Sequence, residues 1–588
     1  MTTVEPKGVT ARLRRFVSNE QIRVACLAVF VGGLGGGAGI AFREAIGLIQ
    51  YLFFGFSDER FHSNAASIPF WIILLAPVAG GLIVGPIVHY LMPDRRPQGV
   101  ADVMEASAFR RARMSRRMGI GGFVVSAITI GSGASAGREG PVVHFAAFLS
   151  TLVSSAFKLD PELRRILLGC AVAAGVASSF NAPIAGVFFA LEVVIGSYAL
   201  ANFAPVVFAS VTGTIVSRSY FGDFPAFIIP QHEIASFWEF PAFAILGCLS
   251  AGVAMALVWS VQTVRRAHDL IKLHPILRPA AGGLLVGAIG VFFPQVMGVG
   301  YEATDEALNE LLPLYMLVLL IVMKTAATAI TLGSGFGGGI FSPSLFLGAM
   351  LGGAFGLIAT EFLPHMSSGH GAYTLVGMGA VAGATLGAPI STFFIVYELT
   401  REPALTIAVM IATVISTQIF TALYQRSFFH WQLAERGINL MGSRESRIIR
   451  QTSVQAVMEQ DYVTIQPNAL LPEMRDKLTQ TRYSEIFVTD EEARLVGTIM
   501  LADLGKHAFS HERDKDLRAI DVCRRSPPVA TVDMDLEEAM NLLEDCNEEH
   551  IAVVAGPEDQ RLMGVLHEHD VMARYHQCII ETRREEAI

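Results

Sequence analysis

The stretch GSGASAGREGP, residues 131–141, places a charged pair between two apolar runs. Its glycines let the backbone approach a ligand closely, and Pro141 suits the first turn of a helix. A helix beginning here exposes free N–H groups and the positive end of its dipole, which attract an anion. Glu139 can occupy that anion position itself and leave it when protonated. We therefore expect Glu139 to be a protonatable gate, because an ionisable residue inside the membrane is a functional candidate by default; a static Arg138–Glu139 pair is the alternative.

A second break of the same design, GSGFGGGIFSP, lies at residues 333–343. Two interrupted hydrophobic segments in corresponding halves indicate a binding site near the bilayer midplane of an inverted-repeat transporter. Two helix N-termini directed at one point would form an anion site. The first break lacks the ending of a P-loop, and close packing of small residues explains scattered glycines but not a charged pair.

The elements that carry these breaks are hydrophobic. The chain has 588 residues, a mean hydropathy of +0.47 and 16% charged residues, against roughly 25% in an ordinary soluble domain. Apolar runs recur from about residue 21 to 423, and each approaches the ~20 residues a helix needs to cross a bilayer. The sequence therefore predicts a polytopic α-helical membrane protein. His144 follows the first break without other ligands or nucleophiles around it, and the cysteines show no metal-ligand spacing, so neither an enzyme nor a metal site is expected.

The composition changes near residue 442. Residues 451–588 contain 28 acidic and 14 basic side chains, and this acidic charge argues against nucleic-acid binding. The region repeats itself at an offset of 67 residues, with Gly497 and Gly564 in equivalent positions. Each copy is expected to form a strand, an amphipathic helix, a strand, a second strand ending at the glycine, and a final helix.

This tail resembles a tandem pair of cystathionine-β-synthase (CBS) domains. The resemblance implies an adenine nucleotide in the cleft between the copies, with Asp503 and Asp570 meeting a ribose. Met500 and His567 stand where the family pattern has a hydroxyl residue. Nucleotide binding and a purely structural dimerisation module therefore stay open as alternatives, and no cofactor is required.

The membrane part resembles the CLC family of chloride channels and proton-coupled anion exchangers. GSGASAGREGP matches its GSGxSxGREGP signature, GGIFSP matches GxFxP, and FNAPIAGVFFALEVV resembles a third segment of the family. The resemblance implies an inverted-repeat fold with broken helices and a homodimer with one anion pathway per subunit. It also implies that backbone N–H groups bind the anion at the residues Arg138, Glu139, Gly140, Ile340 and Phe341.

Three positions depart from the family. Gln98, in PQGVADVMEA, stands at the place of a serine hydroxyl that contacts the central anion. Phe429 stands at the place of a tyrosine that does the same. Exchangers carry two consecutive glutamates where this chain has Glu192 followed by Val193, and valine cannot relay a proton. We therefore expect passive, gated conduction of chloride or a similar small anion, with protons acting at Glu139; a proton-coupled exchanger is the alternative.

A third hypothesis, a cation transporter with a CBS tail, requires intramembrane carboxylate clusters, and the apolar segments hold few acids beyond those named. Seven arginines between residues 95 and 117 place that loop in the cytoplasm by the positive-inside rule. The N-terminus and the tail are expected on the same side of a plasma (inner) membrane. The expected domains are a cytoplasmic N-terminal segment at 1–20, a transmembrane domain at 21–440, a linker at 441–452, CBS copies at 453–511 and 518–577, and a C-terminal tail at 578–588.

Overall fold

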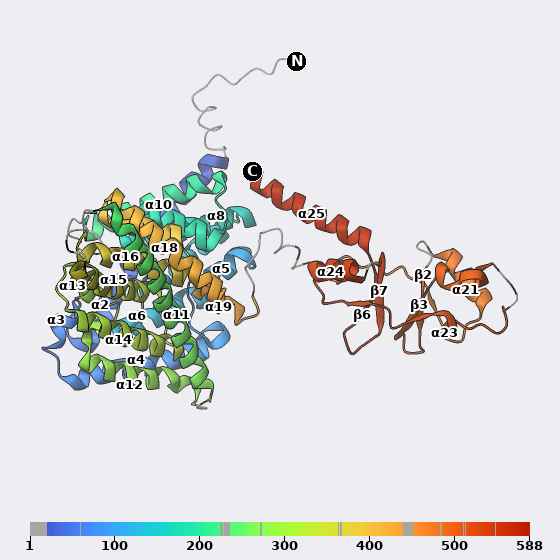
Figure 1. Ribbon diagram of the computed structural model, residues 1–588, viewed down its shortest axis with the longest axis horizontal. Helices are drawn as coiled ribbons and strands as arrows, with labels where there is room; N and C mark the ends of the chain where they lie inside the picture. Colours follow the sequence, from blue (N-terminus) through green and yellow to red (C-terminus); the bar gives the residue numbers. More distant parts are fainter. Residues whose placement is uncertain are drawn as a thin grey trace, which may run out of the picture. The chain divides into compact units, whose positions relative to one another are not determined.

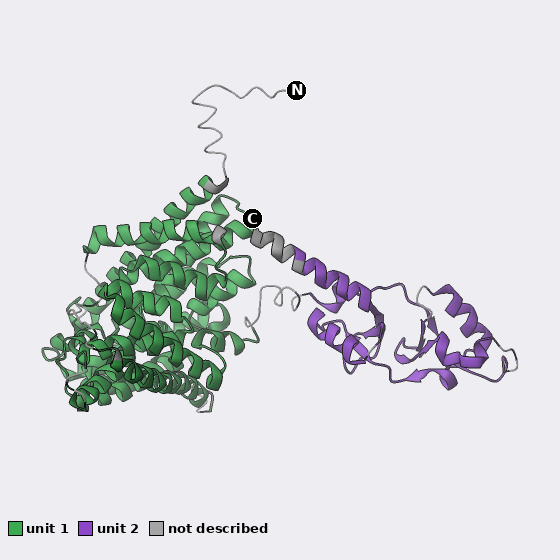
Figure 2. Ribbon diagram, turned by 45° about the horizontal axis from the view of Figure 1, so that its top comes forward, with its two compact units in different colours: residues 1–439 green, residues 440–588 purple. Residues whose placement is uncertain are grey.

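The chain divides into two compact units, residues 1–439 and 440–588 (Figure 2). The expected N-terminal segment and the linker lie almost wholly outside the residues that the structure describes. This computed structural model describes residues 20–58, 60–223, 227, 234, 236–270, 273–362, 364, 367–438, 449, 452–481, 485–509, 511, 513–546 and 548–587.

Helices build the first unit (Figure 1). The first half contains α2 (Glu20–Phe54), α3 (Phe61–Ala65), α4 (Phe70–Pro86), α5 (Val100–Ala108), α6 (Arg116–Gly131), α7 (Glu139–Ala156), α8 (Pro161–Phe180), α9 (Pro183–Phe189) and α10 (Leu200–Phe221). The second half contains α11 (Phe240–Leu270), α12 (Arg278–Phe292), α13 (Tyr301–Leu308), α14 (Leu314–Gly333), α15 (Phe341–Phe362), α16 (His370–Leu386), α17 (Pro389–Thr400) and α18 (Pro403–Tyr424), and α19 (Phe428–Ala434) follows.

The two halves repeat the same packing. Helix α10 packs against α2 and α8 in the first half, and α18 packs against α11 and α16 in the second. Helices α4 and α12 pack against each other across the halves. A Cβ on Gly81 of α4 would lie 2.5 Å from the Ala280 nitrogen, and one on Gly283 of α12 would lie 2.3 Å from the Pro77 oxygen. Such reciprocal contacts are those of two units related by a two-fold axis, which agrees with the predicted inverted repeat.

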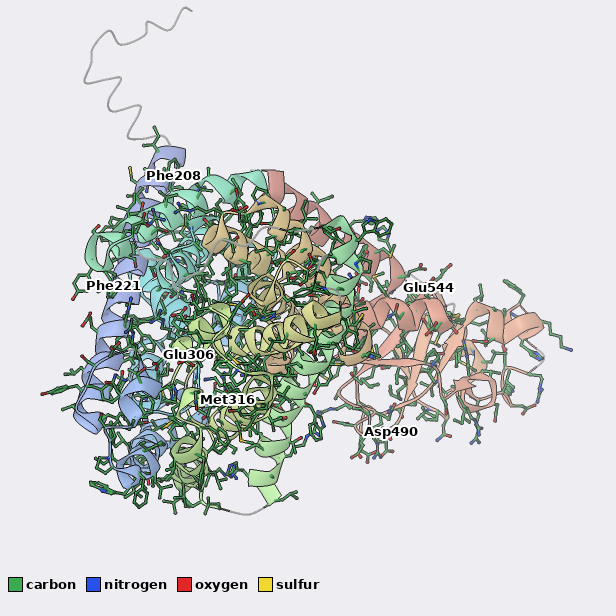
Figure 3. The ribbon with its side chains drawn as sticks, turned by 60° about the vertical axis from the view of Figure 1, so that its left-hand side comes forward. Phe208, Phe221, Glu306, Met316, Asp490 and Glu544 are labelled. Carbon is green, nitrogen blue, oxygen red and sulfur yellow. The ribbon has the colours of Figure 1, made fainter. Side chains whose placement is uncertain are left out.

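Eight helices among the described residues are long and apolar enough to cross a membrane. Large apolar side chains are exposed on several of these helices, and on the neighbouring helix α10 half of the surface of Phe208 is exposed (Figure 3). Small residues fill the helix contacts, because lipid offers no hydrophobic drive for association and close van der Waals packing replaces it.

The second unit has two small sheets and their helices. The first sheet and its helices comprise β1 (Thr464–Ile465), α21 (Leu471–Gln480), β2 (Glu485–Thr489), β3 (Leu495–Met500), α22 (Leu501–Leu504) and, from the start of the second copy, α23 (Ala519–Val522) and β4 (Arg524–Arg525). The second sheet and its helices comprise β5 (Val529–Thr531), α24 (Leu536–Cys546), β6 (His550–Val554), β7 (Leu562–His567) and α25 (Glu568–Ala587). The strand orders are β1-β2-β3-β4 and β5-β6-β7, with the first pair of each sheet parallel.

The repeat of the tail is confirmed, with one correction. Strands β3 and β7 do not end at Gly497 and Gly564 as predicted, but continue three residues further, to Met500 and His567. A Cβ on Gly497 would lie 2.7 Å from the Arg524 oxygen. Gly497 is therefore required because strand β4 approaches it closely, and it does not end strand β3.

Candidate anion pathway

The two breaks meet. The Gly137 N–H donates to the Gly339 oxygen at 2.7 Å, and the Gly339 N–H donates to the Gly137 oxygen at 2.8 Å. Helix α7 begins at Glu139 and helix α15 begins at Phe341, as the sequence predicts. Two helix N-termini therefore lie on either side of one short antiparallel bridge.

Each break is also held by a threonine of the opposite half. The Ser135 N–H donates to Thr331 Oγ1 and the Gly337 N–H donates to Thr129 Oγ1, both at 3.1 Å. A Cβ on Gly140 would lie 3.2 Å from the Gly339 Cα. Glycine is therefore needed here for the two breaks to approach each other. The breaks are thus positioned by reciprocal contacts between the two halves.

The Glu139 carboxylate is buried between these helix ends, with 1% of the residue exposed. The Tyr301 hydroxyl donates to Oε1 at 2.7 Å, and the Ser342 hydroxyl donates to Oε2 at 2.5 Å. Each carboxylate oxygen thus accepts a hydrogen bond from a neutral hydroxyl. The side chain is therefore held by groups that a diffusible anion could equally use.

Arg138 and Glu139 form a long ion pair. The Arg138 Nε lies 4.0 Å from Glu139 Oε1, the outer limit of an ion pair. Its guanidinium instead lies over the Tyr301 ring, 4.7 Å from the ring centre. Arg138 thus supports the tyrosine that binds the carboxylate.

A buried lysine supports the loop that carries Tyr301. Lys324 on α14 is fully buried, and its ammonium donates to the Val296, Gly298 and Val299 oxygens at 3.0, 3.1 and 3.2 Å. All three ammonium hydrogens are thereby used. Because α13 begins at Tyr301, just after this loop, Lys324 positions the hydroxyl that binds the Glu139 carboxylate.

A cavity of about 290 Å³, which we call the Glu139 cavity, adjoins the carboxylate. It brings together six of the predicted site residues, from four separate helix ends: Gln98, Glu139, Gly140, Ile340, Phe341 and Phe429.

The charged lining of the Glu139 cavity is mainly basic. Among the described residues that line it, two acids, Asp102 and Glu139, face five arginines, at positions 95, 96, 265, 278 and 436. Arg96 and Arg436 approach Asp102 Oδ1 at 2.6 and 3.0 Å. The excess of positive charge in a cleft with low-dielectric walls concentrates anions and repels cations.

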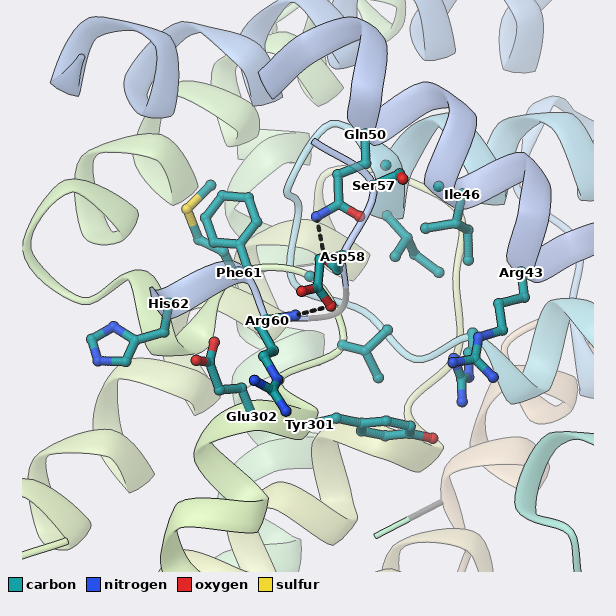
Figure 4. Close-up of a pocket in the computed structure, with 18 of the residues that line it drawn as sticks. Arg43, Ile46, Gln50, Ser57, Asp58, Arg60, Phe61, His62, Tyr301 and Glu302 are labelled. Atoms are coloured by element: carbon teal, nitrogen blue, oxygen red, sulfur yellow. Dashed lines mark hydrogen bonds between the residues drawn. The ribbon is translucent and has the colours of Figure 1, made fainter. Parts of the chain in front are cut away.

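A second cavity, of about 620 Å³, adjoins Tyr301, whose hydroxyl binds the Glu139 carboxylate (Figure 4). We call it the Tyr301 cavity. Arg43, Arg138 and Tyr301 line it, together with acids such as Glu302. Since Tyr301 lines one cavity and Glu139 lines the other, their hydrogen bond lies in the wall between two cavities.

Both substituted positions, Gln98 and Phe429, line the Glu139 cavity. The Gln98 amide, turned so that its nitrogen donates, lies 2.8 Å from Asp102 Oδ1, so one of its donors is used within the wall. Phe429 and Phe428 both line the cavity, with ring centres 6.0 Å apart, and neither offers a donor. Among the described lining residues, the donors near these positions are backbone N–H groups, arginines and polar side chains such as Gln432.

Glu192 and Val193 lie on a turn of π-helix, Ala190–Ile195, and neither is among the described residues that line the Glu139 cavity. The Glu192 carboxylate accepts from the Ile390 N–H at 3.0 Å and from the Ser391 N–H at 2.8 Å, and also from the Ser391 hydroxyl. It therefore caps the N-terminus of α17.

Helix α9 is capped in the same manner. The Ile184 and Ala185 N–H groups donate to the Glu398 carboxylate at 2.9 and 2.8 Å. The segments APIAGVFFALE and APISTFFIVYE, which end in Glu192 and Glu398, are equivalent in the two halves. The exchange of caps gives Glu192 a structural role.

Sequence reasoning missed four residues of this region: Tyr301, Ser342, Lys324 and Glu398. Two of them left a signal. Lys324 is the one charge in the run LYMLVLLIVMK, and the match of the two API segments indicates Glu398. Tyr301 left none, because only the fold brings it to Glu139, 162 positions away.

In the tail, the two predicted ribose contacts differ. The Asp503 carboxylate accepts from the Met500 N–H at 2.8 Å and so caps a short helix. Asp570 lies in the first turn of α25, close to His567 and Glu459.

Comparison with known proteins agrees with this architecture. The sequence profile of the voltage gated chloride channel family matches residues 80–421, and the CBS domain profile matches residues 454–508 and 519–577. The chain is 36% identical over 379 residues to a ClcB-like chloride channel protein of Ralstonia nicotianae, covering 64% of this chain and 88% of that protein. It is 30% identical over 410 residues to the H(+)/Cl(−) exchange transporter ClcA of Vibrio cholerae, covering 67% and 85%.

A solved eukaryotic CLC transporter has the same fold, with a TM-score of 0.61 at 19% identity over 93% of this chain and 98% of that structure. The relatives include a channel protein and a proton-coupled exchanger, so membership by itself establishes anion transport. The family profile covers more than half of the chain. The chain therefore belongs to the voltage gated chloride channel (CLC) family, as a multi-pass membrane protein that transports anions and is not an enzyme, with a tandem CBS pair at its C-terminal end.

Proposed function

We propose that the protein conducts chloride or a similar small anion passively, and that protonation of Glu139 opens the pathway. One observation carries the proposal: the Glu139 carboxylate occupies the junction of two helix N-termini, with a cavity on either side of its hydrogen bond to Tyr301. A carboxylate there substitutes for the transported anion. Protonation removes its charge and weakens its hydrogen bonds to the Tyr301 and Ser342 hydroxyls.

The basic lining of the Glu139 cavity supports anion selectivity. Cation conduction would require the opposite lining, because a hard cation is bound by carboxylate and carbonyl oxygens. The predicted cytoplasmic loop contributes Arg95 and Arg96 to this lining, so we assign the Glu139 cavity to the cytoplasmic side and the Tyr301 cavity to the opposite side. We further propose that the protein lies in the plasma (inner) membrane, with the CBS pair in the cytoplasm as a regulatory module.

The chemistry of Val193 and the hydrogen bonds of Glu192 favour uncoupled anion flow over proton-coupled exchange. Val193 has no titratable group, and the Glu192 carboxylate is engaged by two backbone N–H groups and a hydroxyl of α17. A proton relay would need a carboxylate that can protonate without losing a structural bond. The exchanger remains the second candidate because the Vibrio cholerae relative is named as one.

Reversal potentials in planar bilayers under opposed anion and proton gradients separate the two modes. We expect the potential to follow the anion gradient alone, and a shift with pH at fixed stoichiometry would establish exchange. Glu139→Gln should abolish the pH dependence and leave the pathway open. Unchanged pH dependence in this variant would refute the gate.

We also propose a homodimer with one pathway per subunit, on the strength of the family resemblance. Cross-linking in liposomes, with flux measured in concatenated subunits that carry one Glu139→Gln copy, tests it. Two independent conductance levels are expected, and a single cooperative level would contradict one pathway per subunit.

A further inference from the structure

Three potential metal ligands, one from the first CBS copy and two from the second, converge beside strand β7. Ligand atoms of Glu459, His567 and Asp570 all lie within 4.8 Å of one another. They come from three segments: a stretch preceding β1, the end of β7, and the first turn of α25. His567 Nε2 lies 3.1 Å from Glu459 Oε2, and only 3% of His567 is exposed.

The backbone holds this arrangement in place. Glu459 and Val565 exchange two backbone hydrogen bonds of 2.9 Å, which fix the glutamate beside β7. The His567 ring packs edge-on against the ring of His550, its cross-strand partner on β6, with ring centres 4.8 Å apart. The imidazole therefore has a fixed orientation towards Glu459.

We propose that Glu459, His567 and Asp570 bind a divalent transition-metal ion, Zn²⁺ in preference to Mg²⁺. One imidazole with two carboxylates is a ligand set for Zn²⁺ and its neighbours, whereas Mg²⁺ prefers oxygen ligands alone. Ligands about 2.1 Å from a tetrahedral metal lie roughly 3.4 Å apart, so the existing His567–Glu459 contact already fits. Asp570, partly exposed at a helix end, lies within 4.8 Å of the other two ligand atoms and so has to approach them by at most about 1.4 Å.

Two carboxylates that converge on one imidazole repel each other unless a cation lies among them. An ion pair of protonated His567 with Glu459 would not require Asp570. The cation would join α25 to β7 and to the segment before β1, and so connect the two CBS copies. His567 stands where the CBS pattern has a hydroxyl, and the proposal assigns Asp570 a metal in place of a ribose.

The first CBS copy provides an internal control. At the offset of 67 residues Met500 takes the place of His567, and Asp503 that of Asp570. Thr498, the counterpart of Val565, pairs with Arg524 where Val565 pairs with Glu459. A thioether and an arginine exclude a divalent cation, so one site per chain is expected from this pair of equivalent positions.

The test uses the full-length protein in detergent, freed of metal with EDTA and titrated with Zn²⁺ by calorimetry, with Mg²⁺ as the comparison ion. We expect a saturable Zn²⁺ site that millimolar Mg²⁺ does not fill. Because loss of a mere supporting group costs about 10–100-fold in affinity, His567→Ala and Asp570→Asn should each weaken this site by at least about tenfold. Asp503→Asn is the matched control and should bind as the wild type does.

Asp570→Asn keeps the size of a partly exposed side chain, so it tests the site even if His567→Ala fails to fold. A Co²⁺ spectrum without thiolate charge-transfer bands would separate this site from the cysteines. Wild-type protein without a saturable site, or Asp570→Asn protein with unchanged affinity, would overturn the proposal. The outcome does not depend on whether transport is coupled to protons.

Discussion

Replacing Tyr301 by phenylalanine isolates one hydrogen bond of Glu139, the proposed gate. The change removes the hydroxyl that donates to Glu139 Oε1 at 2.7 Å. It keeps the ring that packs 4.8 Å from the Phe227 ring and under the Arg138 guanidinium. The variant should therefore fold normally and differ mainly in its preference for the charged gate.

The size of the effect follows from the burial and charge of the acceptor. A hydrogen bond to a charged group contributes about 1.5–3 kcal/mol, and one pH unit corresponds to about 1.36 kcal/mol. Because the bond favours the charged carboxylate, its loss makes protonation easier. The pH midpoint of anion flux should rise by about one to two units in Tyr301→Phe.

The assay is chloride efflux from liposomes, measured with an electrode between pH 4 and 9. Ser342→Ala should shift the midpoint in the same direction, because Ser342 donates to the other carboxylate oxygen. Ser344→Ala is the control, since its hydroxyl donates to the Phe341 oxygen on the same helix and does not contact the gate. An unchanged or lowered midpoint in Tyr301→Phe would refute the reasoning.

Three further substitutions test separate parts of the molecule. Lys324→Met leaves the carbonyls of residues 296, 298 and 299 without their donor, so it should lower the thermal midpoint and raise the pH midpoint as Tyr301→Phe does; stability loss without a pH shift would limit Lys324 to a structural role. Glu192→Gln weakens the cap of α17, so we expect a lower melting temperature with an unchanged reversal potential; loss of proton flux would instead show that Glu192 relays protons. In the tail, burial raises the pKa of Glu485 to about 7, so the folded state holds a proton that the unfolded state loses above about pH 4.5, and stability falls as pH rises towards 7. Glu485→Gln should therefore stabilise the tail at pH 8 by roughly 3 kcal/mol at most, measured by hydrogen exchange of β2 in the intact protein and corrected for intrinsic rates; equal protection in both proteins would contradict a buried charge.

The main elements of the fold could be predicted because they depend on local composition. Apolar runs long enough to cross a membrane are rare in soluble proteins. Both helix starts, at Glu139 and Phe341, follow from the conformational preferences of Gly and Pro within a dozen residues. The extent of strands β3 and β7 could not be predicted. The glycines that suggested their ends are required because neighbouring segments of the same protein approach them closely. Local signals cannot distinguish a glycine that ends an element from one that admits a close contact.

The sequence by itself determined that a carboxylate lies at a helix start within the membrane, and that an acidic repeated module follows the membrane domain. Both conclusions rest on residues close together in the chain. The tertiary structure alone decided that Tyr301 and Ser342 hold Glu139, that Glu192 caps a helix, and that His567 meets Glu459 from 108 positions away. These contacts depend on the two-fold arrangement of the halves and on strand pairing, which bring together groups that no local spacing connects.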